Sequence, residues 1–364
     1  MSVLLTKLTI NHMPNNDNQL CVNGRFLSQR MTGIQRFAYE ICCALQQIGV
    51  PITIIAPIDI REEYDLSNLS IDIIGGKGSH FWEQVTLPRY MRQKHNGHIL
   101  LNLSGLSPIL YNNNILTIHD ISYQLRPRSY SLAYCLYYQL MTPLAAKRAR
   151  KILTVSQFSK QELIDHLGIA PQRIAVVYNA VRPTPLLPRE ETERYLLAVG
   201  SLVPRKNIKR LLKAYCNIQK PDYALYIVGG MHAIYADAEL SSYTTKKGVH
   251  FLGYVGGNKL TSLYRNATAY INPSLYEGFG IPLVEAMTQQ CPVIVSDIPA
   301  FHEVCGEAAR YFNPTDIQDI QDKMNLLMHD AELRKQLAER GFEQAKRFSW
   351  ERSAEQIKQL IHAL

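Results

Sequence analysis

Hydrophobic and polar positions alternate along this chain with two different periods. Short runs rich in valine, isoleucine and leucine are followed by longer segments whose apolar residues recur at the spacing of an amphipathic helix. This pattern is typical of parallel sheets whose two faces are covered by helices. In the first half, the predicted strands are 20–22, 52–56, 71–74, 99–102, 115–118, 152–155 and 175–177, and the predicted helices are 33–47, 83–94, 132–148 and 157–167.

Prolines interrupt this alternation in the middle of the chain. Pro183, Pro185 and Pro188 lie within residues 181–192, which can continue neither a helix nor a central strand. We therefore expect a linker there, between a first domain at 1–181 and a second at 193–349.

The alternation restarts after the linker. The predicted strands are 195–199, 224–228, 249–252, 269–272 and 293–296, and the predicted helices are 207–218, 258–265 and 282–289. A helical pattern then runs almost unbroken over 317–363, with Ser349 as the N-cap of a final helix. The predicted fold class is α/β, with two Rossmann-like doubly wound domains facing a cleft that holds the ligand.

Composition excludes a disordered chain, since 46% of the residues are hydrophobic and 19% are charged. The seven cysteines are scattered and form no C-x-x-C pair of the kind that marks a zinc or redox site, so we expect buried, reduced thiols. Residues 1–10 lack the pattern of a secretory signal, and no run of eighteen apolar residues occurs. We therefore expect a cytoplasmic protein.

The net charge of +8 favours an anionic partner, which can be nucleic acid, a membrane surface or a phosphorylated substrate. Residues 121–151 carry six Lys and Arg and no acidic residue, interleaved with five tyrosines. That mixture suits a surface facing anionic lipid. It equally suits a helix whose tyrosines pack inward and whose basic end complements its own dipole, and both interpretations stay open at this point.

The most informative stretch is residues 274–285, which follow a predicted strand and open a helix. Glu277 and Glu285 stand eight positions apart, with Gly278 and Gly280 between them. The glycines allow the backbone to approach a ligand closely, and the free N–H groups of the first helical turn bind phosphate well. Glu277 can accept hydrogen bonds from sugar hydroxyls, and Glu285 can reach a ribose diol.

A second cluster follows the first strand of the second domain. Arg205 and Lys206 stand just before a predicted helix. Two adjacent cations at the carboxyl end of a strand can neutralise a diphosphate leaving group, on which negative charge grows as the glycosidic bond breaks. Taken alone, the pair would be interpreted as a solvated basic turn.

The first domain offers fewer candidates. Residues 24–34 form a glycine-bounded loop without G-x-G-x-x-G, which argues against a nicotinamide cofactor. His119 and Asp120 close the predicted strand 115–118 and project into the same cleft. No D-x-D pair ends a strand in the manner that holds Mg²⁺ or Mn²⁺ against a diphosphate, so we expect no metal and no cofactor.

Together these stretches resemble family 4 retaining glycosyltransferases of the glycosyltransferase-B fold. The resemblance is carried by 32–36, 117–120, 154–159, 177–180, 199–201, 204–207, 251–255, 277–285 and 348–351. Glu277 and Glu285 with the Arg205–Lys206 pair are its specific part. It implies a metal-independent, retaining transfer by front-face attack, with the leaving diphosphate as base.

The resemblance also implies a role for each site residue. Glu277 would contact the donor sugar, Glu285 the ribose, and Arg205 and Lys206 the diphosphate; His119 would face the reacting centre. The final helix, about 350–364, would cross back to the first domain. The remaining donor-binding positions implied are Gly33, Asp120, Gly200, Gly253, Tyr254, Val255, Gly278, Phe279, Gly280 and Ile281.

Two further stretches, 81–88 and 101–105, resemble bacterial members that build O-antigen or other surface polysaccharide, often mannosyltransferases that use GDP-mannose. This implies an undecaprenyl-diphosphate-linked glycan acceptor and a peripheral position on the anionic cytoplasmic face of the inner membrane, with no nucleic-acid partner. Donors carrying UDP or dTDP, a non-catalytic binding subunit of the same fold, and a nucleotide-sugar 2-epimerase remain alternatives.

Overall fold

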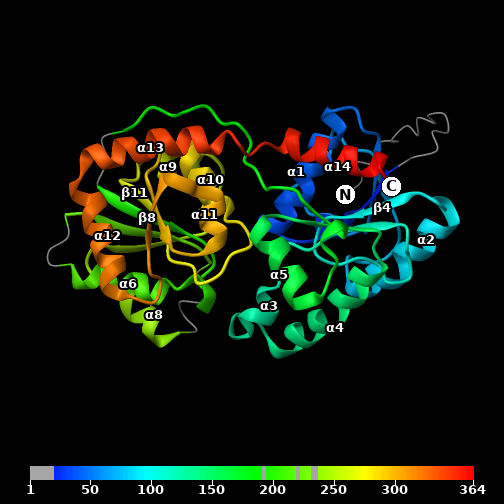
Figure 1. Cartoon of the computed structure of the whole chain (residues 1–364), viewed down its shortest axis with the longest axis horizontal. Helices are drawn as coiled ribbons and strands as arrows, with labels where there is room; N and C mark the ends of the chain where they lie inside the picture. Colours follow the sequence, from blue (N-terminus) through cyan, green and yellow to red (C-terminus); the bar gives the residue numbers. More distant parts are fainter. Residues whose placement is uncertain (1–19, 191–193, 219–221, 231–236) are drawn as a thin grey trace, which may run out of the picture.

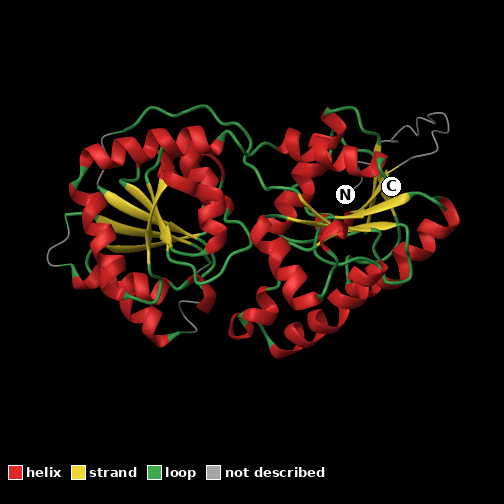
Figure 2. Ribbon diagram, viewed as in Figure 1, coloured by secondary structure: helices red, strands yellow, loops and turns green. Residues whose placement is uncertain are grey.

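The computed structural model describes residues 20–190, 194–218, 222–230 and 237–364. Two lobes lie side by side, each with a central sheet between layers of helices (Figures 1 and 2). The expectation for residues 1–10 and the end of the predicted linker at 191–192 fall outside the described residues.

The first domain is built on a seven-stranded parallel sheet in the order β3-β2-β1-β4-β5-β6-β7. Its strands are β1 (Leu20–Asn23), β2 (Ile52–Ala56), β3 (Ile71–Ile73), β4 (Ile99–Asn102), β5 (Asn114–Thr117), β6 (Lys151–Thr154) and β7 (Ile174–Val176). Its helices are α1 (Gly33–Gln47), α2 (Leu87–Lys94), α3 (Ser122–Leu125), α4 (Leu132–Arg148) and α5 (Gln157–Leu167), and a π-helical turn, η2 (Trp82–Thr86), precedes α2.

The second domain has a six-stranded parallel sheet in the order β10-β9-β8-β11-β12-β13. Its strands are β8 (Tyr195–Val199), β9 (Ala224–Val228), β10 (Val249–Gly253), β11 (Ala269–Asn272), β12 (Val293–Ser296) and β13 (Ala309–Phe312). Its helices are α6 (Ile208–Asn217), α8 (Ala238–Ser242), α9 (Gly257–Asn266), α10 (Ile281–Thr288), α11 (Pro299–Cys305), α12 (Ile317–His329) and α13 (Ala331–Ala345). The two doubly wound sheets confirm the predicted fold class.

The last helix, α14 (Trp350–His362), leaves the second domain and packs on α1 of the first (Figure 1). The Trp350 ring lies 5.9 Å from that of Phe37, and the Ser353 hydroxyl donates to the Tyr178 carbonyl. Phe279 packs against Tyr178 from the opposite domain. One hydrophobic core therefore continues through the junction of the two domains.

The predicted N-cap of the final helix at Ser349 is confirmed. Several other details differ from the sequence expectation. A further break occurs at Asp330, which takes an extended backbone conformation and caps α13, so the helical stretch 317–363 is three helices. Strand β13 was not predicted, since it is a half-buried edge strand with only partial apolar character; α3, α8 and α11 were also missed. Of the cysteines, Cys216 is exposed and Cys43 is partly buried, contrary to the expectation that all are buried.

Candidate active site

Arg205, Lys206 and Glu277 come together where the strand order of the second sheet reverses. The two cations lie in a 3-10 turn after β8, and Glu277 lies in the loop after β11. Strands β8 and β11 are neighbours, and the chain leaves β8 for β9 on its other side. The carboxyl end of a doubly wound sheet at such a reversal is where ligands bind.

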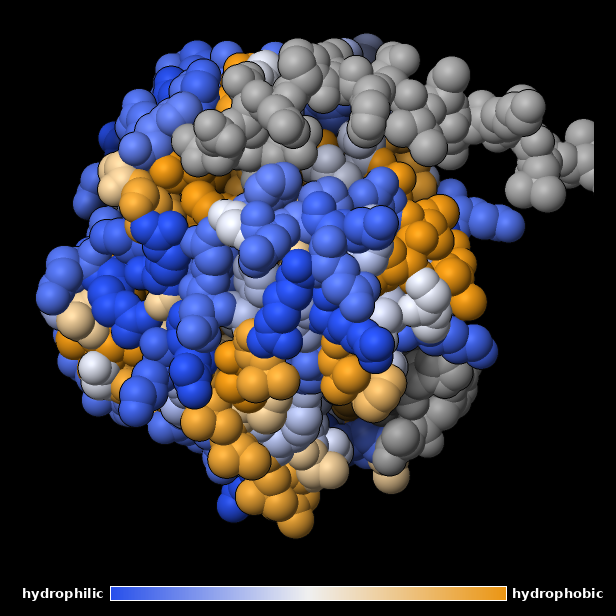
Figure 3. All heavy atoms as spheres, turned by 90° about the vertical axis from the view of Figure 1, so that its right-hand side faces the viewer, coloured by the Kyte–Doolittle hydropathy of each residue, from blue (hydrophilic) through white to orange (hydrophobic). Residues whose placement is uncertain are grey.

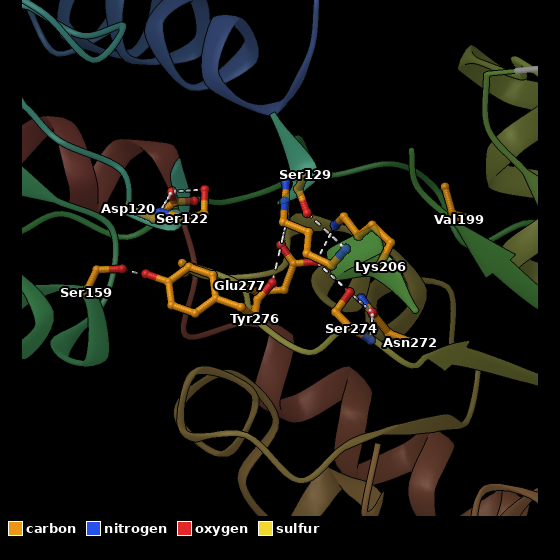
Figure 4. Close-up of polar contacts among 12 residues, drawn as sticks. Asp120, Ser122, Ser129, Ser159, Val199, Lys206, Asn272, Ser274, Tyr276 and Glu277 are labelled. Carbon is orange, nitrogen blue, oxygen red and sulfur yellow. Dashed lines mark hydrogen bonds and ion pairs between the residues drawn. The ribbon is translucent and has the colours of Figure 1, made fainter. Parts of the chain in front are cut away.

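Both cations contact the Glu277 carboxylate (Figure 4). The Lys206 ammonium forms an ion pair with Oε1, and Arg205 Nη1 lies 3.2 Å from Oε2. The Ser274 hydroxyl donates to Oε1 at 2.8 Å, and its oxygen lies 2.7 Å from Asn272 Oδ1. The carboxylate is thus held in one orientation by three donors.

The backbone around the cations is positioned by Asn207. Its φ of 58° lies in the left-handed region, which ends the 3-10 turn and starts α6. Its side-chain amide donates to the carbonyls of Pro273 (3.0 Å) and Pro314 (2.7 Å). These bonds tie the turn carrying Arg205 and Lys206 to the loop that carries Glu277.

Charge pairing outweighs burial at Glu277. Burial by itself would raise the pKa of this carboxyl, but the charges of Lys206 and Arg205, with hydrogen bonds from Lys206 and Ser274, lower it to about 2. Burial lowers the pKa of Lys206, and the negative charge of Glu277 opposes this shift only in part. Burial also acts to lower the pKa of Arg205, yet its pKa is raised because of Glu277, Tyr130 and Asp120.

The first domain presents His119 and Asp120 just beyond β5. His119 Nε2 lies 2.9 Å from the Leu103 carbonyl, so Nε2 carries the proton and Nδ1 is the acceptor in the neutral ring. Burial lowers the pKa of His119, although the Leu103 hydrogen bond and Asp120 oppose the shift. Asp120 Oδ1 accepts from the backbone N–H and hydroxyl of Ser122.

Gly278 packs against protein atoms of the other domain. A Cβ at this position would lie 2.8 Å from the His119 carbonyl oxygen and 3.1 Å from Asp120 Cβ. The Gly278 carbonyl accepts from the hydroxyls of Ser156 (2.6 Å) and Ser159 (3.2 Å). The glycine here permits close contact of the two domains, whereas the sequence interpretation assigned that close approach to a ligand.

The neighbouring positions start α10. Gly280 has a φ of 105°, and a Cβ there would lie 2.9 Å from a Leu283 methyl carbon, so this position requires glycine. The Phe279 ring is buried in the core, so this position can offer only its backbone to a ligand. A Cβ on Gly33 would lie 3.5 Å from Ile281, which brings the starts of α1 and α10 face to face.

Glu285 is engaged separately from Glu277. Arg36 Nη1, on α1 of the first domain, lies 2.6 Å from Glu285 Oε1, and the Tyr264 hydroxyl donates to Oε2 at 2.9 Å. The two glutamates therefore have different cationic partners. Arg36 belongs to the stretch 32–36, which carries part of the family resemblance, but was not assigned a role.

The remaining predicted positions lie along the edges of the same junction. Gly253 has a φ of 68° at the end of β10, and Tyr254 is 66% exposed with the Arg30 guanidinium 4.6 Å above its ring. Val255 is buried. Gly200, with a φ of 155°, lies beside the Lys206 side chain. The two domains thus approach each other at Arg30 as well as at Arg36.

Sequence reasoning missed several residues that build this site. Ser274 and Asn272 orient Glu277, and Ser129 of the first domain accepts from the Arg205 backbone N–H at 3.1 Å. Ser156 and Ser159 bind Gly278 across the domain junction. In the sequence, these residues stood out only by lying in or next to stretches already noted. A single serine or asparagine forms no recognisable motif.

Two family models together match most of the chain. Residues 31–184 match the model described as Glycosyltransferase Family 4, and residues 186–344 match Glycosyl transferases group 1. O-antigen chain mannosyltransferase RfbU of Salmonella typhimurium is 38% identical over 211 residues, which are 57% of this chain and 58% of that protein. O-antigen chain mannosyltransferase B of Escherichia coli is 32% identical over 255 residues, which are 65% of this chain and 67% of that protein.

Solved structures show the same fold at lower identity. Sucrose-phosphate synthase from Thermosynechococcus elongatus superposes with a TM-score of 0.75 at 17% identity, covering 95% of this chain and 98% of that one. WaaG, described as a glycosyltransferase involved in lipopolysaccharide biosynthesis, superposes with a TM-score of 0.71 at 16% identity, covering 94% and 99%. These likenesses establish the two-domain architecture.

Proposed function

Because this chain belongs to glycosyltransferase family 4 and has the glycosyltransferase-B fold, we propose that it is a retaining mannosyltransferase of O-antigen assembly, with GDP-mannose as donor and a lipid-linked glycan as acceptor. One observation carries the proposal: two cations and a carboxylate converge at the carboxyl edge of the second sheet, beside His119 of the first domain.

The cations suit a diphosphate leaving group. As the bond between the sugar and the phosphate oxygen breaks, negative charge accumulates on the diphosphate, and Arg205 and Lys206 stabilise it there. Nε of Arg205 is a buried donor without a hydrogen-bond partner among the described residues, which leaves it available to a phosphate oxygen. Protein cations then supply the charge stabilisation, so the proposed reaction needs no metal ion.

The low basicity of Glu277 favours a particular proton route. A carboxylate with a pKa of about 2 is a weak base and a weak nucleophile, because two cations already hold its charge. We assign it to binding sugar hydroxyls. The acceptor hydroxyl then attacks the anomeric carbon on the face from which the diphosphate departs, and it passes its proton to the departing phosphate oxygen, which retains the configuration.

The donor assignment rests on the relatives. Both curated relatives described above are named O-antigen chain mannosyltransferases. A solved structure with a TM-score of 0.74 at 16% identity is described as a complex with UDP and glucose. A UDP- or dTDP-sugar is therefore the alternative donor, and the exposed Tyr254, proposed to lie against the base, is the position where the base would be discriminated.

Helix α4 supports a membrane-bound acceptor. Leu132, Leu136, Leu140 and Leu144, the leucine stripe, recur every four residues and are 76%, 58%, 64% and 43% exposed. Hydrophobic side chains gather at the lower edge of the face in Figure 3, where α4 lies. Basic residues flank the stripe: Arg126, Arg128, Lys147, Arg148, Arg150 and Lys151.

The tyrosines of α4 occupy a different face. Tyr134 stacks between Tyr130 and Tyr138, with ring centroids 5.1 and 4.3 Å apart, and the Tyr130 hydroxyl bonds to Ser122. The leucines are thus left to face outward, bordered by positive charge. We propose that this side of α4 rests on an anionic bilayer, where it meets a lipid-linked acceptor. None of the described helices is long and apolar enough to cross a bilayer.

A transfer assay tests the function. Radiolabelled mannose should pass from GDP-mannose to lipid-linked oligosaccharide in O-antigen-producing membranes, and transfer should persist in a chelator. Glu277→Gln should reduce turnover by about 10²- to 10³-fold, whereas Glu339→Gln, on an exposed face of α13, should leave it unchanged. Equal turnover in Glu277→Gln contradicts the assigned site, and transfer only from UDP- or dTDP-sugars contradicts the donor.

A further inference from the structure

A second cluster of polar side chains lies in the first domain. Cys21 lies within β1, and His95 and His98 lie between α2 and β4. One ligand atom from each of these residues lies within 4.8 Å of the other two. Among the described residues, this is the one group of three or more His, Cys, Asp or Glu with such spacing.

The two histidines are held on the same turn. The His98 backbone N–H donates to the His95 carbonyl at 3.0 Å, and Gly97 between them has a φ of 84°, which the tight turn requires. The Tyr111 hydroxyl donates to the His98 carbonyl at 2.6 Å, and the Asn113 amide donates to the Gly97 carbonyl at 2.7 Å. Tyr111 and Asn113 therefore hold the turn in place without a bound ligand.

One of the two imidazoles has a nitrogen without a partner. His98 Nδ1 is buried and has no hydrogen-bond partner among the described residues, whereas His95 Nε2 is paired with a carboxylate. Buried polar atoms are normally satisfied, so such a nitrogen beside a second imidazole and a thiol indicates a missing ligand. Asp72 Oδ2, on β3, lies 3.3 Å from His95 Nε2 and is itself held by the Tyr90 hydroxyl at 3.2 Å.

We propose that Cys21, His95 and His98 bind a zinc ion, with a water molecule as the fourth ligand. One sulfur, two imidazole nitrogens and one water oxygen form a donor set that suits tetrahedral zinc. Tyr90 holds the Asp72 carboxylate, which orients His95, and Tyr111 orients the turn that carries both histidines. The metal enters from the side of the histidines, which are partly exposed, since Cys21 is fully buried.

Binding changes the protonation of Cys21. Burial, with a contribution from the Asp72 charge, raises the pKa of the Cys21 thiol to about 12, so the metal-free protein carries a neutral thiol. Zinc replaces that proton: the sulfur–hydrogen bond breaks, the sulfur–zinc bond forms, and the proton passes to solvent.

The ion joins parts of the chain that are distant in sequence. It links β1 to the turn before β4, and these two strands are neighbours in the middle of the first sheet. His98 precedes the amino end of β4, whereas the candidate active site lies at the carboxyl ends of strands. The ion consequently stabilises the first domain and takes no part in sugar transfer, which keeps this inference independent of the proposed function.

Cobalt binding tests the site directly. Full-length protein without a polyhistidine tag is treated with chelator and titrated with Co²⁺. We expect one equivalent to bind with the visible bands of tetrahedral cobalt and a near-ultraviolet sulfur-to-cobalt charge-transfer band, and zinc to displace it. Absence of the charge-transfer band in folded protein overturns the proposal.

Matched variants separate the ligands from general effects on folding. Cys21→Ser should abolish the charge-transfer band, and Tyr90→Phe, which leaves all three protein ligands, should weaken metal binding by roughly 10-fold. Cys216→Ser, at an exposed cysteine, should bind as the parent does. Zinc should raise the melting temperature of the parent and not of Cys21→Ser. A charge-transfer band that persists in Cys21→Ser, or is lost in Cys216→Ser, contradicts the assigned ligands.

Discussion

Glu277 shows how the surroundings of one residue decide its chemistry. Its carboxylate is buried, yet it stays ionised because Lys206, Arg205 and Ser274 all direct donors at it. Breaking such a buried cluster by removing one charge leaves the others uncompensated, which is strongly unfavourable. The same contacts that lower the basicity of Glu277 therefore also make it part of the stability of the second domain.

The pH dependence of stability follows from this lowered pKa. Because the pKa of Glu277 falls from 4.5 to about 2 on folding, its ionised form stabilises the protein above pH 4.5, and this stabilisation is lost as the pH falls toward 2. The loss amounts to about 3 kcal/mol. Free energies of unfolding measured in urea across this range should fall more steeply for the parent than for Glu277→Gln. If the free energy of unfolding falls equally with pH in the parent and in Glu277→Gln, the assigned pKa is contradicted.

At the scale of elements, α4 combines two faces with different roles. Its tyrosines stack on one another above the Ser122 hydroxyl, while its leucine stripe stays exposed. Of the two interpretations drawn from residues 121–151, the structure bears on packing alone: the tyrosines stack on one another, and contact of the basic, leucine-bearing side with anionic lipid stays a prediction. Residue spacing alone could not assign these faces, since leucine and tyrosine both recur every four residues.

The leucine stripe should govern membrane binding. Changing Leu136 and Leu140 to glutamine should weaken binding to vesicles of phosphatidylglycerol and phosphatidylethanolamine by about 100-fold, because each inserted leucine contributes about 1.5 kcal/mol or more. Binding of the parent should also weaken as salt is added. Leu326→Gln, at an exposed leucine of α12, serves as the control in co-sedimentation. Undiminished binding by the double variant rules out this surface.

Across the whole molecule, the two domains are joined by polar contacts around the candidate site. The Glu303 carboxylate of α11 accepts from the backbone N–H groups of Gln157 (2.7 Å) and Phe158 (3.0 Å) at the start of α5. Arg36 pairs with Glu285, and Ser156 binds the Gly278 carbonyl. The second domain thus satisfies the free N–H groups of a helix in the first.

Removing the Glu303 contact should loosen this junction without unfolding either domain. The loss of a helix cap costs about 1 kcal/mol. In Glu303→Ala, amide hydrogens at the start of α5 should therefore exchange about five times faster than in the parent, while those of α14 keep their rate. Glu303→Gln, which retains an acceptor oxygen, should show an intermediate effect. Unchanged exchange at α5 means that the domains separate freely in solution.

Local patterns predicted most elements of this chain, and they failed where tertiary contacts define an element. Strands such as β8 and β12 are buried on both faces, so their apolar runs are unmistakable. Strand β13 is a half-buried edge strand and α11 has only seven residues, so neither gives an apolar pattern as clear as that of a buried strand or a long helix. The structure brings together Arg205, Lys206 and Glu277, which the sequence singled out. Two residues were not assigned: Ser274, because a single hydroxyl near Glu277 forms no motif, and Arg36, because its partner Glu285 is 249 positions away.

The sequence by itself determined the two-domain α/β class and marked the stretches in which we expect the chemistry, because strand and helix periods and loop motifs are local properties of the chain. The tertiary structure decided the partnerships. Glu277 pairs with Arg205 across 72 positions, and Glu285 pairs with Arg36 across 249. Such pairs depend on strand order and on how the two sheets face each other. The hydrophobic pattern along the chain contains no information on either.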